Sequence, residues 1–309
     1  MAIVIVSDIK NLQPWISALK KEDPSIEVTT MENISDKKAV KFALAWNYPH
    51  GLFREYPAIK TISSMGAGVD HLISDPLLQE NIRIVRIVDP LLSQDMYEFT
   101  LALIMNRLRQ ITYYHDNQKM GLWKKRKYLR ISDVRVGIMG TGVIGNYIAS
   151  KLQSSGFNVS GWGRTPGREA FYKKYSGNDQ LKEFLSVTDI LICLLPLTSA
   201  TEGILNKNNL LLLPEKSWVI NLGRGGHVVD NDLIELIDSG HLEGASLDVF
   251  RNEPLPEEHP FWLHQKILLT PHIASLPQPE SVAPQIIENY HRTLENRPLI
   301  NLVNRETGY

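Results

Sequence analysis

The stretch "VGIMGTGVIG" (residues 136–145) has the pattern of a buried strand, a glycine-rich turn and the start of a helix. Its glycines have the spacing G-x-G-x-x-G of a dinucleotide-binding turn. In such turns the first glycine permits the tight bend, the second lets the backbone approach a pyrophosphate, and the third lets helix and strand pack closely. Three glycines alone are also compatible with a tight connection that binds nothing. The residues expected to contact a cofactor here are Gly140, Gly142, Val143, Ile144 and Gly145.

Apolar segments alternate with helical patterns after this turn. The helix that begins at the turn should end at Gly156, and Asp230 should cap a helix that ends before Gly240. An alternation of this kind predicts a parallel sheet covered by helices on both faces. The strands expected in this part of the chain are residues 135–139, 157–162, 190–194, 218–222, 245–249 and 267–270.

A second α/β unit is expected before the glycine turn. Its long helix should run from about Ser93 to Lys119, with an apolar stripe at spacings of three and four that ends at Ile111. This helix and the turn divide the chain into two units, of which the second is the more regular. The earlier elements expected are strands at residues 2–6, 42–46, 60–63 and 82–88 and a helix at residues 12–20.

The size and charge of the chain limit its possible functions. A chain of 309 residues should hold two domains, because single cores seldom grow beyond about 250–300 residues. A net charge of −1 argues against a nucleic-acid surface, and the apolar run at residues 3–6 is too short for a signal peptide or a membrane span. The single cysteine, Cys193, should pack as a small hydrophobe in a strand. A cytoplasmic protein with no membrane partner fits these features.

The end of the strand after the glycine turn predicts which cofactor is preferred. The acidic residue that binds the ribose of NAD normally lies about 20 residues after the turn, but Gly163 occupies this position and Arg164 follows it. An arginine can instead form charge-assisted hydrogen bonds with the 2′-phosphate of NADP. We therefore expect NADP(H) to be preferred, with NAD(H) possible; the alternative is that these arginines are only surface residues. The expected contacts with the adenosine half are Trp162, Arg164, Thr165 and Arg168.

Charged side chains follow three of the predicted strands. Arg224 follows the strand at 218–222, Asp248 lies at the end of the next strand with Glu253 just beyond it, and His272 follows the last one. Arginine can bind a carboxylate through two parallel hydrogen bonds, and a histidine oriented by a carboxylate can donate a proton to an oxygen that gains charge. Each residue alone is more often structural, but together they indicate a site for a 2-oxo acid. No cysteine–histidine cluster is present for a catalytic zinc, so no metal is expected.

Several motifs resemble those of the D-isomer-specific 2-hydroxyacid dehydrogenases, most closely the glyoxylate/hydroxypyruvate reductase branch. The resemblance covers nearly the whole chain, and the motifs occur in the family's order and spacing. They are "SSMGAGVDHL", "GTGVIG", "LLPLTSATEGILN", "INLGRGGHVVD", "LDVFRNEPLP" and "TPHIAS". The motif around Gly223 departs slightly from the family, which often has alanine at that position; we expect the change to be tolerated, because the strand still delivers Arg224.

This resemblance implies an α/β fold in which a Rossmann-type cofactor domain is inserted into a flavodoxin-like substrate domain formed by both chain ends. Residues 1–98 and 273–309 would form the substrate domain, and residues 99–272 the NAD(P)-binding domain, with the active cleft between them. The glycine turn would then lie midway along the chain because the second domain begins there.

The resemblance also implies a role for each site residue. Arg224 would orient the substrate, His272 would be the general acid and Glu253 its partner. Asp248 would hydrogen-bond the nicotinamide carboxamide. The other expected cofactor contacts are Leu195, Pro196, Thr201, Leu222 and Gly223. The expected substrate contacts are the backbone of Ala67 and Gly68, with Trp46 and Met65 as candidates that limit substrate size or are simply core residues.

The expected function is transfer of a hydride from NADPH to the carbonyl of a small 2-oxo acid such as glyoxylate or hydroxypyruvate. Two alternatives remain open: a nucleotide-sensing regulatory protein on the same fold, and a family dehydrogenase with another substrate, such as formate. A homodimer is also expected, because Phe99, Leu103 and Tyr113 lie outside the stripe assigned inward and residues 120–123 are apolar for a loop. Packing of these residues within one protomer is the competing interpretation.

Overall fold

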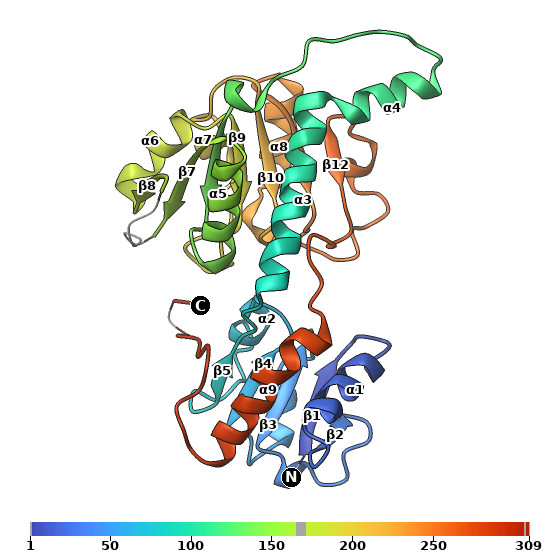
Figure 1. Cartoon of the computed structure of the whole chain (residues 1–309), viewed down its shortest axis with the longest axis vertical. Helices are drawn as coiled ribbons and strands as arrows, with labels where there is room; N and C mark the ends of the chain where they lie inside the picture. The colour runs from blue at the N-terminus through green and yellow to red at the C-terminus, as the bar shows by residue number, and fades with distance from the viewer. Residues whose placement is uncertain (1, 165–170, 306, 309) are drawn as a thin grey trace. The chain divides into compact units, whose positions relative to one another are not determined.

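The chain forms two compact units in a computed structural model that describes residues 2–164, 171–305, 307 and 308. The terminal unit consists of Met1–Leu92 and Leu276–Tyr309, and the central unit of Ser93–Ser275 (Figure 1). Each unit contains one all-parallel sheet. The predicted α/β fold, with one unit inserted into the other, is therefore confirmed. Within the described residues, no helix is both long and apolar enough to span a bilayer.

The terminal unit is built on a five-stranded sheet of order β2-β1-β3-β4-β5, which is the order of flavodoxin-like sheets. Helices α1 and α9 pack together over one face, where their apolar side chains cover Ile3, Ile5 and Phe42. The elements are β1 (Ala2–Ser7), α1 (Gln13–Glu22), β2 (Glu27–Thr30), η1 (Lys37–Ala39), β3 (Phe42–Trp46), η2 (Leu52–Glu55), β4 (Thr61–Ser64), α2 (Asp70–Ile73), β5 (Arg83–Val85) and α9 (Pro279–Leu294).

The central unit is built on a seven-stranded sheet of order β12-β11-β10-β9-β6-β7-β8, the doubly wound order of dinucleotide-binding sheets. Helices α6, α7 and α8 contribute to one large apolar cluster on this sheet. The strands are β6 (Arg135–Met139), β7 (Asn158–Gly163), β8 (Lys173–Ser176), β9 (Ile190–Cys193), β10 (Ser217–Asn221), β11 (Leu242–Leu247) and β12 (Ile267–Leu269). The helices are α3 (Pro90–Arg109), α4 (Ile111–Lys119), η3 (Ile131–Asp133), α5 (Val143–Ser154), η4 (Asn178–Gln180), α6 (Leu181–Ser186), α7 (Lys207–Leu210), η5 (Gly225–His227), α8 (Asp230–Asp238) and η6 (Pro260–Leu263).

The long helix expected up to Lys119 is instead two helices. Gln110 has a left-handed backbone with φ of 56°, which ends α3, and the Asn106 side chain accepts the amide of Thr112 (3.0 Å) across the break. Because α4 follows at a new angle (Figure 1), Ile111 is 58% exposed and does not continue the apolar stripe. Leu103, which lies outside the predicted apolar stripe and was expected to face a partner, is buried in its own protomer.

Three smaller expectations also differ from the structure. Asp230 is the first residue of α8 and not its cap, since Val229 occupies the cap position. The strand expected at residues 82–88 is confined to Arg83–Val85. Trp46 ends the third strand along the chain and not the second, because β2 precedes it.

Candidate active site

Polar groups from three adjacent strands meet at one edge of the central sheet. β10, β11 and β12 are parallel neighbours, so their carboxyl ends lie side by side. Arg224 follows β10, Asp248 follows β11, and His272 follows β12. The glycine turn after β6 lies at the carboxyl edge of the same sheet, where open α/β sheets bind their ligands.

His272 and Glu253 form a hydrogen-bonded pair at this edge. Nδ1 of His272 lies 2.7 Å from Oε2 of Glu253, while Oε1 of Glu253 accepts the amide of Phe250 (2.8 Å). Each of the two side chains is 36% exposed, so the pair is held by the protein and remains accessible to a ligand. With Nδ1 facing the carboxylate, the opposite nitrogen, Nε2, is the one that a ligand would meet.

The surroundings of Glu253 favour its charged form. Burial alone would raise the pKa of this carboxyl, but hydrogen bonds from His272 and the Phe250 amide, with the positive charges of His272 and Arg224, hold the pKa below its ordinary value. A lowered pKa in the folded protein means that this stabilisation is present above the usual glutamate range and is lost as the pH falls through the folded value. Glu253 is therefore an anion at neutral pH and can orient the imidazole.

His272 itself lies in a strained turn that Asp248 holds in place. The backbone of His272 is left-handed, with φ of 54°, which costs a non-glycine residue about 1–2 kcal/mol. Asp248 is 1% exposed, and its carboxylate accepts hydrogen bonds from Thr270 Oγ1 (2.6 Å) and from the amides of Ile273 and Ala274 (2.9 Å each). Its backbone carbonyl also accepts the amide of His272 (2.8 Å). Asp248 therefore fixes the segment that carries His272, a role that the sequence did not indicate.

The turn that carries Arg224 packs closely against the segment that carries Glu253. A side chain on Gly225 would collide with the backbone of Phe250, so only glycine permits this approach. Asn221 Nδ2 donates to the carbonyl of Arg224 (2.9 Å), and Nη1 of Arg224 donates to the carbonyl of Gly223 (2.8 Å). The Arg224 side chain thus extends from a fixed turn that packs against the segment of Glu253.

The glycine turn has the geometry that a pyrophosphate requires. Gly140 has φ of 103°, and a Cβ there would lie 2.7 Å from the Leu194 backbone, so this glycine serves the tight bend. Gly145 must be glycine because a Cβ would collide with the carbonyl of Gly140. Gly142 is different: its backbone is extended, and a Cβ would meet nothing within 4 Å. Packing explains the first and third glycines, whereas Gly142 leaves open space in front of the amides that begin α5, where Val143 is 50% exposed.

The end of β7, which was expected to bind the adenosine half of the cofactor, is only partly as predicted. Arg164 is exposed at the end of β7. Trp162 is 4% exposed, packs in the apolar cluster of the sheet and donates from Nε1 to the carbonyl of Gly177 (2.9 Å), so in this structure its ring faces the core and does not present a stacking surface for adenine. Thr165 and Arg168 lie outside the described residues.

The remaining expected contacts lie in loops that begin where strands end. In the central unit, Leu195, Pro196 and Thr201 belong to the loop after β9, where Thr201 Oγ1 donates to the carbonyl of Pro196 (2.6 Å). Leu222 and Gly223 connect β10 to Arg224, and both are buried.

In the terminal unit, Ala67 and Gly68 are half-buried in the loop after β4. Trp46, at the end of β3, contacts His71 in a tilted arrangement, with ring centres 4.6 Å apart. Met65 is 2% exposed in the core, in agreement with the structural alternative for this residue.

Comparison with known proteins identifies the family. Residues 101–274 match the model described as D-isomer specific 2-hydroxyacid dehydrogenase, NAD binding domain. The chain belongs to this family. The matched NAD-binding domain occupies the middle of the chain. The glycine turn lies far from the N-terminus because it belongs to this domain.

Relatives within the family match the whole chain. A glyoxylate/hydroxypyruvate reductase A of Photorhabdus laumondii is 34% identical over 314 residues, which cover 100% of both chains. The structure of a D-isomer specific 2-hydroxyacid dehydrogenase from Xanthobacter autotrophicus Py2, in complex with NADPH and MES, is 36% identical with a TM-score of 0.94, covering 100% of this chain and 99% of the other. That of an NADPH-dependent glyoxylate/hydroxypyruvate reductase from Sinorhizobium meliloti, in complex with NADP and sulfate, is 34% identical with a TM-score of 0.90, covering 99% and 100%.

Proposed function

We propose that the protein is a reductase that converts a small 2-oxo acid, such as glyoxylate or hydroxypyruvate, into the 2-hydroxy acid with NADPH as the preferred cofactor. The observation that carries this proposal is the His272–Glu253 pair, which lies at the same sheet edge as Arg224 and the glycine turn. When bound, the nicotinamide cofactor would supply the hydride. The protein residues would bind the acid, orient its carbonyl and provide the proton.

Each of the three charged residues would contribute a distinct part of this chemistry. The guanidinium of Arg224 would bind the carboxylate of the substrate through two hydrogen bonds. His272 would donate a proton from Nε2 to the carbonyl oxygen as that oxygen gains negative charge. Glu253, which accepts Nδ1–H, would keep the ring in the orientation that this transfer needs. The backbone of Ala67 and Gly68 would hold the carboxylate, and Asp248 would fix the His272 turn beside the nicotinamide.

A direct assay decides between this proposal and its alternatives. Oxidation of NADPH, followed by absorbance with glyoxylate, hydroxypyruvate and bulkier 2-oxo acids, should proceed with at least one small acid. Binding of NADPH without turnover of any acid would favour the nucleotide-sensing alternative. Turnover only with formate and oxidised cofactor would favour a family dehydrogenase with a different substrate.

Cofactor preference gives a prediction at the end of β7. Replacing Arg164 with alanine is expected to weaken NADPH binding by about 10- to 100-fold and to leave NADH binding nearly unchanged, because charge-assisted hydrogen bonds are worth about 1.5–3 kcal/mol each. Replacing Gly163 with aspartate should shift the preference toward NADH, since a carboxylate binds the ribose and repels a 2′-phosphate. Both effects can be measured as Kd values for the two cofactors.

A matched control for Arg164→Ala is Lys151→Ala, which removes an equal charge from an exposed position of α5. Lys151→Ala should leave both cofactor affinities unchanged. Equal kcat/KM for NADPH and NADH in the unaltered protein would contradict the proposed binding of the 2′-phosphate by Arg164. Arg164 would then be only a surface residue.

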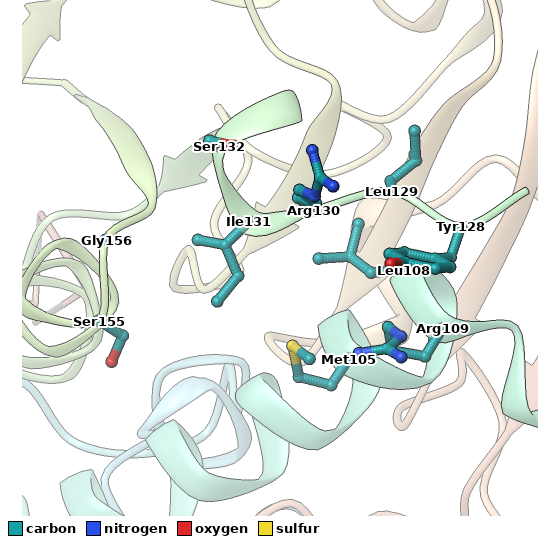
Figure 2. A pocket seen from close by; sticks show the side chains of 10 residues that line it. All are labelled: Met105, Leu108, Arg109, Tyr128, Leu129, Arg130, Ile131, Ser132, Ser155 and Gly156. Carbon is teal, nitrogen blue, oxygen red and sulfur yellow. The ribbon is translucent and has the colours of Figure 1, made fainter.

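We also propose a homodimer, carried by the apolar loop after α4. Trp123 is 94% exposed, and Met120 and Leu122 are 63% and 52% exposed. A hollow of about 390 Å³ lies further along the chain, lined in part by residues 128–132, and Met105 and Leu108 of α3 face Ile131 across it (Figure 2). Among the residues first expected at the interface, Leu103 is buried in its own protomer. Tyr113 is also covered there, by the guanidinium of Arg126 at 3.6 Å from its ring centre.

Sedimentation should therefore give a dimer, and replacing Trp123 with serine should weaken it by about 30-fold or more, as is typical when a buried aromatic anchor is lost. Leu263→Ser is the control, because Leu263 is 90% exposed in the same unit but lies far along the chain from the loop. A monomer at micromolar concentration would refute the proposed interface.

A further inference from the structure

His227 is a fully buried histidine next to the proposed site that none of the roles above uses. It ends the short helix η5 and is 0% exposed, although histidine is polar at both ring nitrogens. Buried polar groups are normally hydrogen-bonded, and each partner of such a group restricts its position. The partners of this ring therefore show what the side chain holds together.

The two ring nitrogens bind two different loops of the central unit. Nδ1 accepts the backbone amide of Arg224 (3.1 Å), and Nε2 lies 3.3 Å from the carbonyl of Pro196. A backbone amide can only donate, so Nδ1 must carry the lone pair and the proton of the neutral ring lies on Nε2. Nε2–H then donates to Pro196. The ring thus joins the turn that carries Arg224 to the loop after β9.

Two other backbone groups of the turn are held without this ring. The carbonyl of His227 accepts the amide of Leu205 (2.9 Å), and the carbonyl of Gly226 accepts the amide of Gly203 (2.9 Å). These bonds attach the turn to the segment before α7 whatever side chain position 227 carries. The imidazole adds the bonds to the Arg224 amide and the Pro196 carbonyl, besides a contact with the buried thiol of Cys193 in β9.

The residue before Arg224 is fitted to the same ring. A Cβ on Gly223 would lie 3.0 Å from Cε1 of His227 and 3.0 Å from the carbonyl of Leu195, which is tighter than ordinary contact. The ring is bonded to the Arg224 turn and to the loop after β9, and Leu195 belongs to that loop. A movement of either group would therefore displace a loop of the proposed site. Alanine, which the family often has at this position, should therefore disturb the ring in this chain.

We propose that His227 is a positioning residue that fixes Arg224 relative to the cofactor loop at Pro196. The substrate-binding and cofactor-binding groups of the central unit thereby keep a constant position relative to each other. This inference rests on the proposed function of Arg224 and of the loop after β9. It assigns two separable duties to one side chain: Nδ1 places the substrate-binding arginine, and Nε2 places the loop that the cofactor passes.

Two substitutions separate these duties. In His227→Asn, Oδ1 occupies the place of Nδ1 and can still accept the Arg224 amide, but nothing reaches Pro196. In His227→Gln, Nε2 of the amide occupies the place of the imidazole Nε2 and can still donate to Pro196, but the acceptor for Arg224 is lost. A purely structural histidine would make both variants lose stability and affect both ligands alike.

Calorimetry would measure two affinities for each variant: NADPH, and oxamate, a non-reducible analogue of a 2-oxo acid, on the NADP⁺-loaded protein. His227→Asn should weaken NADPH by about three- to tenfold, as expected for one lost hydrogen bond, and leave oxamate within about twofold. His227→Gln should leave NADPH within about twofold, weaken oxamate by about tenfold and lower kcat/KM further, because small misplacements of a positioning group are costly.

His241→Gln is the matched control, because His241 also bonds a backbone carbonyl through Nε2 (Leu210, 3.1 Å) but lies just before β11, at the other end of the strands. It should leave both affinities unchanged. If both His227 variants weaken both ligands equally, or neither ligand, the positioning role is wrong. If one variant does not fold, Gly223→Ala, which moves the ring without removing it, must weaken both ligands for the role to stand. Oxamate binding without turnover of any 2-oxo acid would reject the proposed reductase but not the role of His227.

Discussion

Replacing His272 with alanine is expected to lower kcat/KM for the 2-oxo acid by about 10²- to 10⁴-fold, the usual effect of removing one positioned proton donor. NADPH affinity should remain close to that of the unaltered protein, because the glycine turn and the β7 end are unchanged. The measurement is steady-state kinetics at saturating NADPH, together with the Kd for NADPH. His272→Asn should lose activity to the same extent while tolerating the left-handed backbone at this position (φ of 54°).

A second histidine provides the control for this result. His264 is also paired with a carboxylate, Asp238, at 3.2 Å, but it lies before β12 and not after it. His264→Ala should keep nearly full activity. Glu253→Gln should shift the acidic side of the pH–activity profile and not abolish turnover, since the neutral amide can still accept the ring N–H. Wild-type turnover in His272→Ala would mean that the proposed site is not the reacting one.

The second large effect is expected at Arg224. Its replacement by alanine should lower kcat/KM by about 10²-fold or more, because two hydrogen bonds between charged groups, each worth about 1.5–3 kcal/mol, are lost. Lysine should not restore the activity, since an ammonium group cannot reproduce the two-pronged geometry of a guanidinium. The loss should be seen in the KM for the acid and in oxamate affinity, with NADPH binding unchanged.

Arg251→Ala is the matched control for loss of a positive charge near this sheet edge. Arg251 follows β11 and forms an exposed ion pair with Glu202 (2.9 Å), of a kind that contributes little to stability. Its replacement should change kcat/KM by less than about threefold. An effect as large as that of Arg224→Ala would show that general charge, and not a specific contact with the carboxylate, holds the substrate.

The sequence predicted the positions of the candidate site residues where a regular pattern determines position. Parallel strands bring their carboxyl ends to one edge, so locating three strands was enough to bring Arg224, Glu253 and His272 together. The glycine turn was equally clear, because its spacing has a geometric cause. By contrast, β2 and β8 were missed because each is a four-residue strand with one buried side chain, which gives no recognisable alternation.

Other features depend on contacts that a local pattern cannot show. Trp162 follows alternation into the core, but its hydrogen bond to Gly177 is visible only in the folded sheet. The break at Gln110 has no glycine or proline to mark it. In the sequence, Asp248 stands out only as an acidic residue at a strand end, and His227 as an isolated polar residue. Their partners, at positions 270–274 for Asp248 and at 196 and 224 for His227, become apparent only once the strand ends meet.

The division of the terminal unit between the two ends of the chain affects how the protein is made. On the ribosome, β1 and β3 are synthesised early, yet the side chains of α9 that cover Ile3 and Phe42 come from Val282, Ile286 and Tyr290. Because domains fold as units while the chain grows from its N-terminus, the first sheet must wait, with one apolar face covered only by α1, until the central unit has been completed. The central unit is contiguous and meets no such delay. A nascent chain of this protein therefore finishes its second unit before its first.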